Sequence, residues 1–242
     1  IYMIKNYNGG LRIAVELTTF CDSPPGSGLG TSSTLVVSMV KAFSGLLDLD
    51  LDNHTVAEVA YKIERIECHL MGGRQDQYSA AFGGFNFIEF AESGNVTVNN
   101  LDVSSKAIQE LEASFILFFT GVSRDSDRII LNQSNNVKNK HKVAVEAMHS
   151  IKKEAKIMKK HLLEENFSGI VQSMKNGWEN KKKTTDVISN PLIEEIYDCA
   201  VNSGALAGKV SGAGGGGFMI FFVPIEKRKL VIDSLSRFNG EL

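Results

Sequence analysis

A glycine-rich turn that leads into hydroxyl residues is the part of this sequence best suited to chemistry. In "SPPGSGLGTSS", Gly26, Gly28 and Gly30 alternate with other residues and are followed at once by Thr31 and Ser32. Glycine adopts backbone conformations closed to other residues and lets a ligand approach the main chain closely. The first amides of a following helix, and the positive end of its dipole, would point at the same place. The turn therefore predicts an anion site, and a phosphate group is its natural occupant.

Two common phosphate-binding motifs do not fit this turn. A Walker A loop needs a lysine after its last glycine, and none follows Gly30. The dinucleotide fingerprint has a different glycine spacing from the G-x-G-x-G found here. A plain loop that ends in an N-cap serine is the alternative interpretation, and the alternation of the glycines makes it the less favoured one.

Two acidic residues in "IERIECHLMGGRQDQY" could complete a site for phosphate transfer. Glu64 lies on a predicted helix, and Asp76 lies in a polar segment after a glycine pair. A Mg²⁺ bound to nucleotide phosphates needs only one or two protein oxygens, which a glutamate and a helix-start hydroxyl could supply. An aspartate beside an acceptor hydroxyl could orient or deprotonate it. Taken singly, Glu64 could instead be a solvated helix residue and Asp76 a turn or cap residue.

A second glycine run, in "KVSGAGGGGFMIFF", separates two apolar segments. Four consecutive glycines cost backbone entropy and contribute no side-chain packing. Such a run is favoured where another backbone or a ligand comes very close. A strained hairpin is the alternative.

The rest of the sequence predicts mixed helices and strands in two domains. Strands are expected over residues 11–20, 85–90 and 95–103, and helices over 34–47 and 52–73. The second helix carries the capping-box pair Thr55 and Glu58 and would end at the glycines 72–73. Residues 113–121 form a continuous apolar run, which is typical of a strand buried on both faces. Helical periodicity follows over about 132–180, then a helix over 190–204, a strand, glycine loop and strand over 207–224, and a last helix over 226–238. The pattern changes near residue 110, so we expect domains over 1–110 and 111–242.

Composition and cysteine usage set broad limits on partners and location. The 242 residues are 43% hydrophobic and 22% charged, with a net charge of −2, so neither a nucleic acid nor a membrane is indicated as a partner. Three cysteines without CxxC spacing favour neither a disulfide framework nor a structural zinc site. No signal peptide and no apolar run of membrane-spanning length is evident, so a cytoplasmic location is expected.

Together, these pieces resemble the GHMP kinases. "PPGSGLGTSS" is similar to the second motif of that family, "SGAGGGGF" to its third, and "GGRQDQYSAAFGGFNFIEF" to the segment that carries its catalytic aspartate. The resemblance implies an α+β fold of two domains. The first would be strand-rich with a left-handed βαβ crossover, and the second would be ferredoxin-like. The family's first motif lies in an N-terminal segment and has no match in these 242 residues, so we expect the sequence either to be a fragment or to lack that segment.

The resemblance also implies roles for particular residues. Asp76 would be the catalytic aspartate, Ser32 and Glu64 would bind Mg²⁺ with Glu67 as a weaker candidate, and Arg74 would serve a phosphate. The loop around the phosphates of ATP would comprise Pro25, Gly26, Ser27, Gly28, Leu29, Gly30, Thr31 and Ser32. The sugar pocket would be bordered by Asp76, Arg74, Gly212, Ala213, Gly214 and Gly215.

Within the family, segments such as "RQDQYSAAFGGFNFI" and "GKVSGAGGGGFMIFF" most resemble the sequences of one group of kinases. These kinases phosphorylate the anomeric hydroxyl of D-glycero-D-manno-heptose 7-phosphate. The implied cofactors are ATP and Mg²⁺, and the implied partner is a small sugar phosphate. Arg124 and Arg128 are candidates for binding the 7-phosphate. Another acceptor, such as galactose or fucose, and a non-catalytic nucleotide-binding relative are the alternatives left open.

Overall fold

The protein consists of two compact units. The computed structural model describes residues 1–9, 13–24, 26–123 and 126–241. Unit 1 comprises the described residues of 1–25 and 30–100, and unit 2 comprises those of 26–29 and 101–242. The division at 100–101 lies ten residues before the predicted domain boundary at 110. Four residues of the predicted phosphate turn, 26–29, pack with unit 2 although the residues on both sides of them belong to unit 1.

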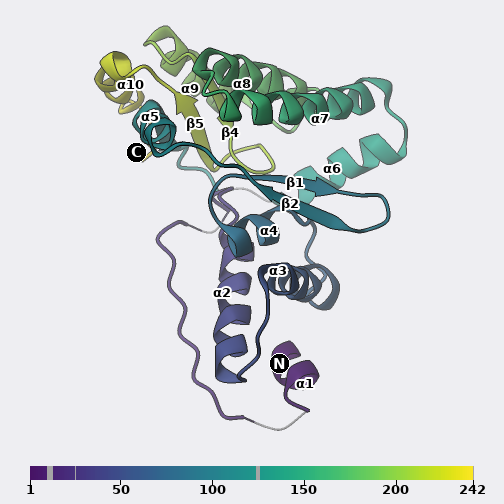
Figure 1. The fold of residues 1–242 in the computed structure, drawn as a ribbon. Coiled ribbons are helices and arrows are strands. Elements are labelled where there is room, and N and C mark those ends of the chain that lie inside the picture. Colours follow the sequence, from purple (N-terminus) through teal and green to yellow (C-terminus); the bar gives the residue numbers. More distant parts are fainter. Residues whose placement is uncertain (10–12, 25, 124–125, 242) are drawn as a thin grey trace. The chain divides into compact units, whose positions relative to one another are not determined.

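Unit 1 is mainly helical. Its helices are α1 (Tyr2–Tyr7), α2 (Thr31–Leu46), α3 (Asn53–Tyr61), the π-helix η1 (Lys62–Glu67) and α4 (Gln75–Phe82). Strands β1 (Asn86–Phe90) and β2 (Val96–Asn100) form an antiparallel hairpin (Figure 1). The core lies where α2, α3 and α4 meet and includes Val40, Val59 and Tyr78. The predicted helix over 34–47 and the two predicted strands of the hairpin are confirmed.

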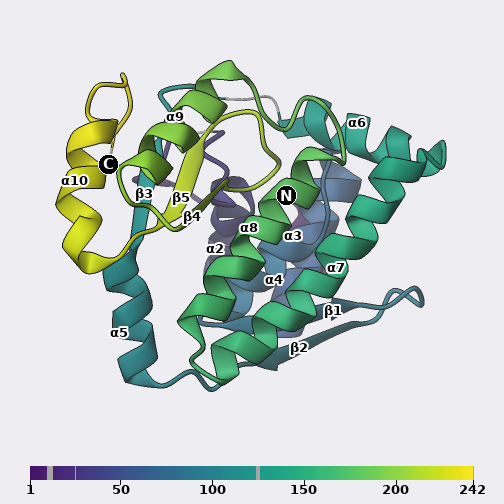
Figure 2. The same ribbon diagram turned by 90° about the horizontal axis from the view of Figure 1, so that it is seen from above.

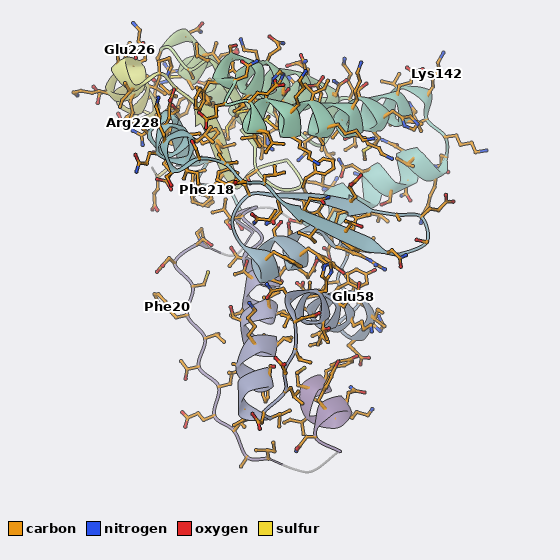
Figure 3. The ribbon with its side chains drawn as sticks, in the orientation of Figure 1. Phe20, Glu58, Lys142, Phe218, Glu226 and Arg228 are labelled. Atoms are coloured by element: carbon orange, nitrogen blue, oxygen red, sulfur yellow. The ribbon has the colours of Figure 1, made fainter. Side chains whose placement is uncertain are left out.

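Three details of unit 1 differ from the sequence predictions. Residues 13–20 are not a strand, because no described strand pairs with them and their apolar side chains stay exposed; Phe20 is 86% exposed (Figure 3). The N-cap of α3 is Asp52 and not Thr55: the Asp52 carboxylate accepts the amide of Thr55 at 2.7 Å, which lowers the pKa of Asp52. The described part of unit 1 contains no parallel strand pair, so the left-handed crossover is not found in it.

The helix predicted over 52–73 ends earlier and changes its winding. From Lys62 the chain continues as the π-helix η1, in which the amide of Cys68 donates to the carbonyl of Ile63, five residues back. Such a turn inserts one extra residue into a helix and is frequent at functional sites. It rotates the side chains of 62–67 relative to those of α3.

Unit 2 is built on an antiparallel sheet. Strands β3 (Phe115–Phe119), β4 (Ala207–Val210) and β5 (Phe218–Phe222) pair in the order β3-β5-β4, and a single bridge joins Phe119 to Glu241. Because β5 pairs with one side of β3 and Glu241 with the other, the full order is Glu241, β3, β5, β4. This is the strand order of a ferredoxin-like βαββαβ sheet, with its last strand reduced to one bridge. The α+β fold class and the ferredoxin-like arrangement are confirmed.

Helices cover the sheet of unit 2. They are α5 (Ser105–Ser114), α6 (Ser126–Lys138), α7 (Lys142–Leu163), α8 (Phe167–Lys182), α9 (Pro191–Asn202), the short 3₁₀ helix η2 (Ile225–Lys227) and α10 (Arg228–Leu235). Helices α7 and α8 lie side by side, and α9 lies next to α10 (Figure 2). The core contains Trp178, Ile196 and Phe221. On β3, Phe118 is buried but Leu117 is 43% exposed, so the prediction of a strand buried on both faces was wrong.

Two further features of the described residues concern chemistry and location. The three cysteines form no disulfide: Cys21 and Cys68 are exposed, and Cys199 is buried. No helix in the described part of the chain combines the length and the apolar character needed to cross a bilayer.

Candidate functional site

Residues 26–29 of the glycine turn are anchored in unit 2 by their carbonyl oxygens. The amide of Phe218 donates to the carbonyl of Ser27 at 2.8 Å, and the hydroxyl of Ser211 donates to the carbonyl of Gly28 at 3.0 Å. Over the described residues, the amides of Gly26, Gly28 and Gly30 donate no hydrogen bond. The turn is therefore held by its acceptors, and the amides of these three glycines stay available as donors, as the predicted anion site requires.

The loop between β4 and β5 is packed against other main chain. Gly217 has a φ of +80°, and a Cβ placed there would lie 2.3 Å from the carbonyl oxygen of Ser27. The carbonyl of Gly217 accepts the amide of Thr120 at 3.0 Å. The amide of Gly215 donates to the carbonyl of Ile188 at 2.7 Å. The glycine run thus permits close approach of other backbone segments, including the phosphate turn.

Four of the six residues predicted to border a sugar pocket, 212–215, differ in their surroundings. Gly212 is exposed, and its carbonyl accepts the Lys181 ammonium. Ala213 packs against the core of unit 2. Gly214 is buried, and a Cβ there would contact Ile188 at 3.0 Å. Gly212 is consequently the most open of the four, whereas Ala213, Gly214 and Gly215 are packed against the chain itself.

The start of α2 brings the other half of the turn beside Asp76 in unit 1. Gly30 is the N-cap of α2 in a left-handed conformation, with φ 73° and ψ 18°, and its carbonyl accepts the amide of Thr34 at 2.9 Å. A Cβ at Gly30 would lie 3.4 Å from Cβ and Cγ of Asp76. Asp76 is exposed and lies in the first turn of α4. The predicted catalytic carboxylate therefore stands next to the helix start that is predicted to face phosphate.

Glu64 is a buried carboxylate with neutral partners. It is 1% exposed, its Oε1 accepts the Ser32 hydroxyl at 2.8 Å, and its Oε2 accepts the Gln77 amide at 2.5 Å. Among the described residues, no lysine or arginine forms an ion pair with it. Burying a charge without a cation is unfavourable, so this carboxylate is suited to a bound cation. Glu67, the weaker candidate, is exposed.

The donor set at Ser32 and Glu64 fits Mg²⁺ held together with nucleotide phosphates. Both groups offer oxygen, which is the ligand atom that Mg²⁺ prefers. No cluster of three or more His, Cys, Asp or Glu residues capable of holding a metal occurs in the part of the chain that the structure describes. A metal that takes its other ligands from phosphate and water needs no such cluster.

Arg74 has partners inside unit 1. Its guanidinium donates to the carbonyl of Gly94 at 2.9 Å, lies 3.5 Å from Oε1 of Glu58, and stacks 4.5 Å from the centre of the Tyr61 ring. The Tyr78 hydroxyl donates to the same Glu58 oxygen at 2.7 Å, and burial together with that carboxylate raises the pKa of Tyr78. These contacts link α3, α4 and the β1–β2 turn. A phosphate would have to compete with Glu58 for Arg74.

Sequence reasoning missed two residues that the structure places at these sites. Gln77 contacts Glu64, and Ser211 contacts the phosphate turn. The sequence offered a signal for each of them. Gln77 is next to Asp76, and Ser211 stands at the start of the second glycine run. Of the candidates for a sugar phosphate, Arg128 lies on α6, whereas Arg124 lies outside the described residues, as does Pro25 of the phosphate turn.

Comparisons with known proteins define the class. Residues 1–84 match the N-terminal domain of the GHMP kinases, and residues 158–241 match their C-terminal domain. The chain is 42% identical, over 94% of its length, to a D-glycero-alpha-D-manno-heptose 7-phosphate kinase of Campylobacter jejuni and covers 67% of that protein. It is 29% identical to a mevalonate kinase of Thermococcus onnurineus over 98% of this chain and 66% of that one.

A solved structure of a sugar phosphate kinase is also similar to this chain. A D-glycero-D-manno-heptose 1-phosphate kinase from Bacteriodes thetaiotaomicron superimposes with a TM-score of 0.73 at 39% identity, over 91% of this chain and 61% of that one. The chain thus spans roughly three fifths to two thirds of the length of these relatives. It belongs to the GHMP kinase family.

Proposed function

We propose that this protein is a sugar kinase that transfers the γ-phosphoryl group of ATP to the anomeric hydroxyl of D-glycero-D-manno-heptose 7-phosphate, giving the 1,7-bisphosphate. The observation that carries the proposal is the arrangement at the start of α2, where Asp76 lies beside Gly30 and Ser32 contacts Glu64. The 42% identity to a kinase with that substrate in its name supports the choice of acceptor. A location in the cytoplasm, where ATP is abundant, goes with this proposal.

In this reaction, the chain would act by positioning and by stabilising charge. Main-chain amides of 26–32 would bind phosphate oxygens, and the dipole of α2 would add to their attraction. Asp76 would accept a hydrogen bond from the anomeric hydroxyl, orient it, and take its proton as the sugar oxygen bonds to the γ-phosphorus. The bond from that phosphorus to the β–γ bridging oxygen of ATP would break in the same step, and ADP would leave. Ser32 and Glu64 would hold Mg²⁺, which neutralises charge on the phosphates when it is bound. Phosphoryl transfer asks for no covalent intermediate on the protein.

Ser32→Ala is expected to raise the Mg²⁺ concentration required for half-maximal activity by about tenfold or more. The substitution removes a proposed metal ligand and also the hydroxyl that donates to Glu64. The measurement is a Mg²⁺ titration of ATP consumption at saturating nucleotide. Ser38→Ala is the matched control, because Ser38 lies on the same helix, is exposed, and only bonds to the carbonyl of Thr34. An unchanged titration for Ser32→Ala would remove Ser32 from the metal site.

The acceptor is tested with a panel of sugars in an ATP-consumption assay, supported by thermal shift. The panel holds heptose 7-phosphate, heptose 1-phosphate, galactose and fucose. We expect heptose 7-phosphate to give the highest kcat/KM. Faster turnover of another sugar would overturn the choice of acceptor and keep the kinase. Nucleotide binding without turnover of any sugar in the panel would favour the non-catalytic alternative.

A further inference from the structure

Gln77 joins three parts of the proposed site. It follows Asp76 on α4, and its side chain is fully buried, with 0% exposure. Its amide nitrogen donates to Oε2 of Glu64 at 2.5 Å and to the hydroxyl of Ser33, in the first turn of α2, at 3.1 Å. One side chain thus connects the helix of Asp76, the π-helix of Glu64 and the start of α2.

The orientation of the Gln77 amide is set by the carboxylate. Its two N–H groups are used by Glu64 and Ser33, whereas its carbonyl oxygen is buried without a hydrogen-bond partner in the described residues. Turning the amide round would place that oxygen against Oε2 of Glu64, and two acceptors would then face each other. Leaving a buried carbonyl unpaired is destabilising. A leucine or methionine would fill the same space without that cost, so packing alone does not account for a glutamine here.

Holding Oε2 also fixes the other oxygen of Glu64. With Gln77 at Oε2 and the Ser32 hydroxyl at Oε1, the plane of the carboxylate cannot turn freely. The hydrogen of Ser32 is used in this bond, and lone pairs of its Oγ stay available to a cation. The two proposed metal ligands are therefore oriented before any cation binds.

We propose that Gln77 is a positioning residue that holds Glu64 in the orientation required to bind Mg²⁺ with the nucleotide. This inference rests on the proposed function, because it takes Ser32 and Glu64 as the metal ligands. Outer partners of metal ligands contribute strongly to affinity in general, about 10- to 100-fold when they are removed. Gln77 does not touch substrate in this proposal and acts only through Glu64.

The test measures metal binding without catalysis. The melting temperature of the full chain is recorded with a non-hydrolysable ATP analogue, first in EDTA and then with increasing Mg²⁺, which separates the nucleotide contribution from the metal contribution. Gln77→Met keeps the volume of the side chain and removes both donors. We expect its shift in EDTA to match that of the unsubstituted protein, while the Mg²⁺ concentration for half of the metal-dependent shift rises about 10- to 100-fold.

A matched control separates positioning from general destabilisation. Ser44→Ala removes another buried hydrogen bond of the same unit, from the Ser44 hydroxyl to the carbonyl of Leu49 at 2.7 Å, at the other end of α2. It should lower the starting melting temperature and leave the Mg²⁺ dependence unchanged. A Gln77→Met protein with the original Mg²⁺ dependence overturns the proposal.

Three other outcomes are also decisive. If Gln77→Met does not fold, Ser33→Ala is used, because it removes the second anchor of the amide. A smaller shift of the Mg²⁺ dependence in the same direction supports the proposal, and no shift overturns it. If the unsubstituted protein binds the nucleotide but gains nothing from Mg²⁺, the magnesium site itself is refuted, and the role of Gln77 falls with it. If the unsubstituted protein does not bind the nucleotide analogue in EDTA, that result counts against the proposed kinase function itself.

Discussion

Asp76→Asn is expected to lower kcat by about 10²- to 10⁴-fold, the range typical for removal of a general base. The substitution keeps the size of the side chain and takes away the negative charge that would orient the sugar hydroxyl and accept its proton. Affinity for ATP should hardly change, because Asp76 is exposed in the first turn of α4 and lies beside the helix start without being one of its donors. Turnover is measured as ADP release, and nucleotide affinity by thermal shift or calorimetry.

The control for this prediction is Asp102→Asn, a change of the same chemistry at an exposed carboxylate outside the proposed site. It should leave both kcat and nucleotide affinity unaltered. A near-normal kcat in Asp76→Asn would exclude Asp76 from the chemical step. A large loss of nucleotide affinity would assign it to binding instead.

Gly217→Ala is expected to weaken both the stability of unit 2 and the affinity for nucleotide. The backbone there has a φ of +80°, which costs a residue with a side chain about 1–2 kcal/mol. The added Cβ would also lie 2.3 Å from the carbonyl of Ser27, so β5 and the phosphate turn would have to separate. The hydrogen bond from the amide of Phe218 to that carbonyl would be lost with them. The expected fall in Tm is about 4 °C or more.

A second glycine supplies the control. Gly177 lies inside α8, and a Cβ added to it would meet nothing within 4 Å. Gly177→Ala should therefore stabilise the protein by about 0.5–1 kcal/mol, since glycine is a poor helix former, and leave nucleotide affinity unchanged. If Gly217→Ala bound nucleotide as well as Gly177→Ala does, the anchoring of the turn by β5 would not matter for the site.

Sequence alone predicted the elements whose pattern is local. The apolar spacing in α2, the helical periodicity over about 132–180 and the alternation in the β1–β2 hairpin all depend on neighbours a few residues away. Helix α5 was not predicted, although Ser104 caps it by accepting the amide of Ala107 at 3.1 Å. Short capped helices of this kind are readable from sequence.

Features that depend on distant residues were not predicted. Residues 13–20 have the alternation of a strand, but a strand also needs a hydrogen-bonding neighbour, and the sequence of the segment does not supply one. Whether a face of β3 is exposed likewise depends on which elements pack against it, and the composition of the strand does not reveal this.

The candidate site also contains features that local sequence predicted and features that depend on distant residues. Residue types and spacing indicated Ser32, Glu64 and Asp76, because hydroxyls, carboxylates and glycines carry recognisable chemistry. The π-helix that turns Glu64 inward and the Gln77 amide that meets it depend on long-range packing, with Gln77 and Ser33 lying 44 residues apart. Arg74 shows the converse case, since its charge suggested a ligand and its contacts are with Glu58, Gly94 and Tyr61.

The membership of residues 26–29 in unit 2 bears on how the protein could be divided for experiments. The backbone leaves one unit, contributes four residues to the other, and returns, so no single cut separates the two bodies. A fragment starting at Leu101 would leave the amide of Phe218 and the hydroxyl of Ser211 without the carbonyls that they bind. A fragment ending at Asn100 would keep those four residues as an unanchored stretch. Dissection into halves would therefore damage the segment that is proposed to bind an anion.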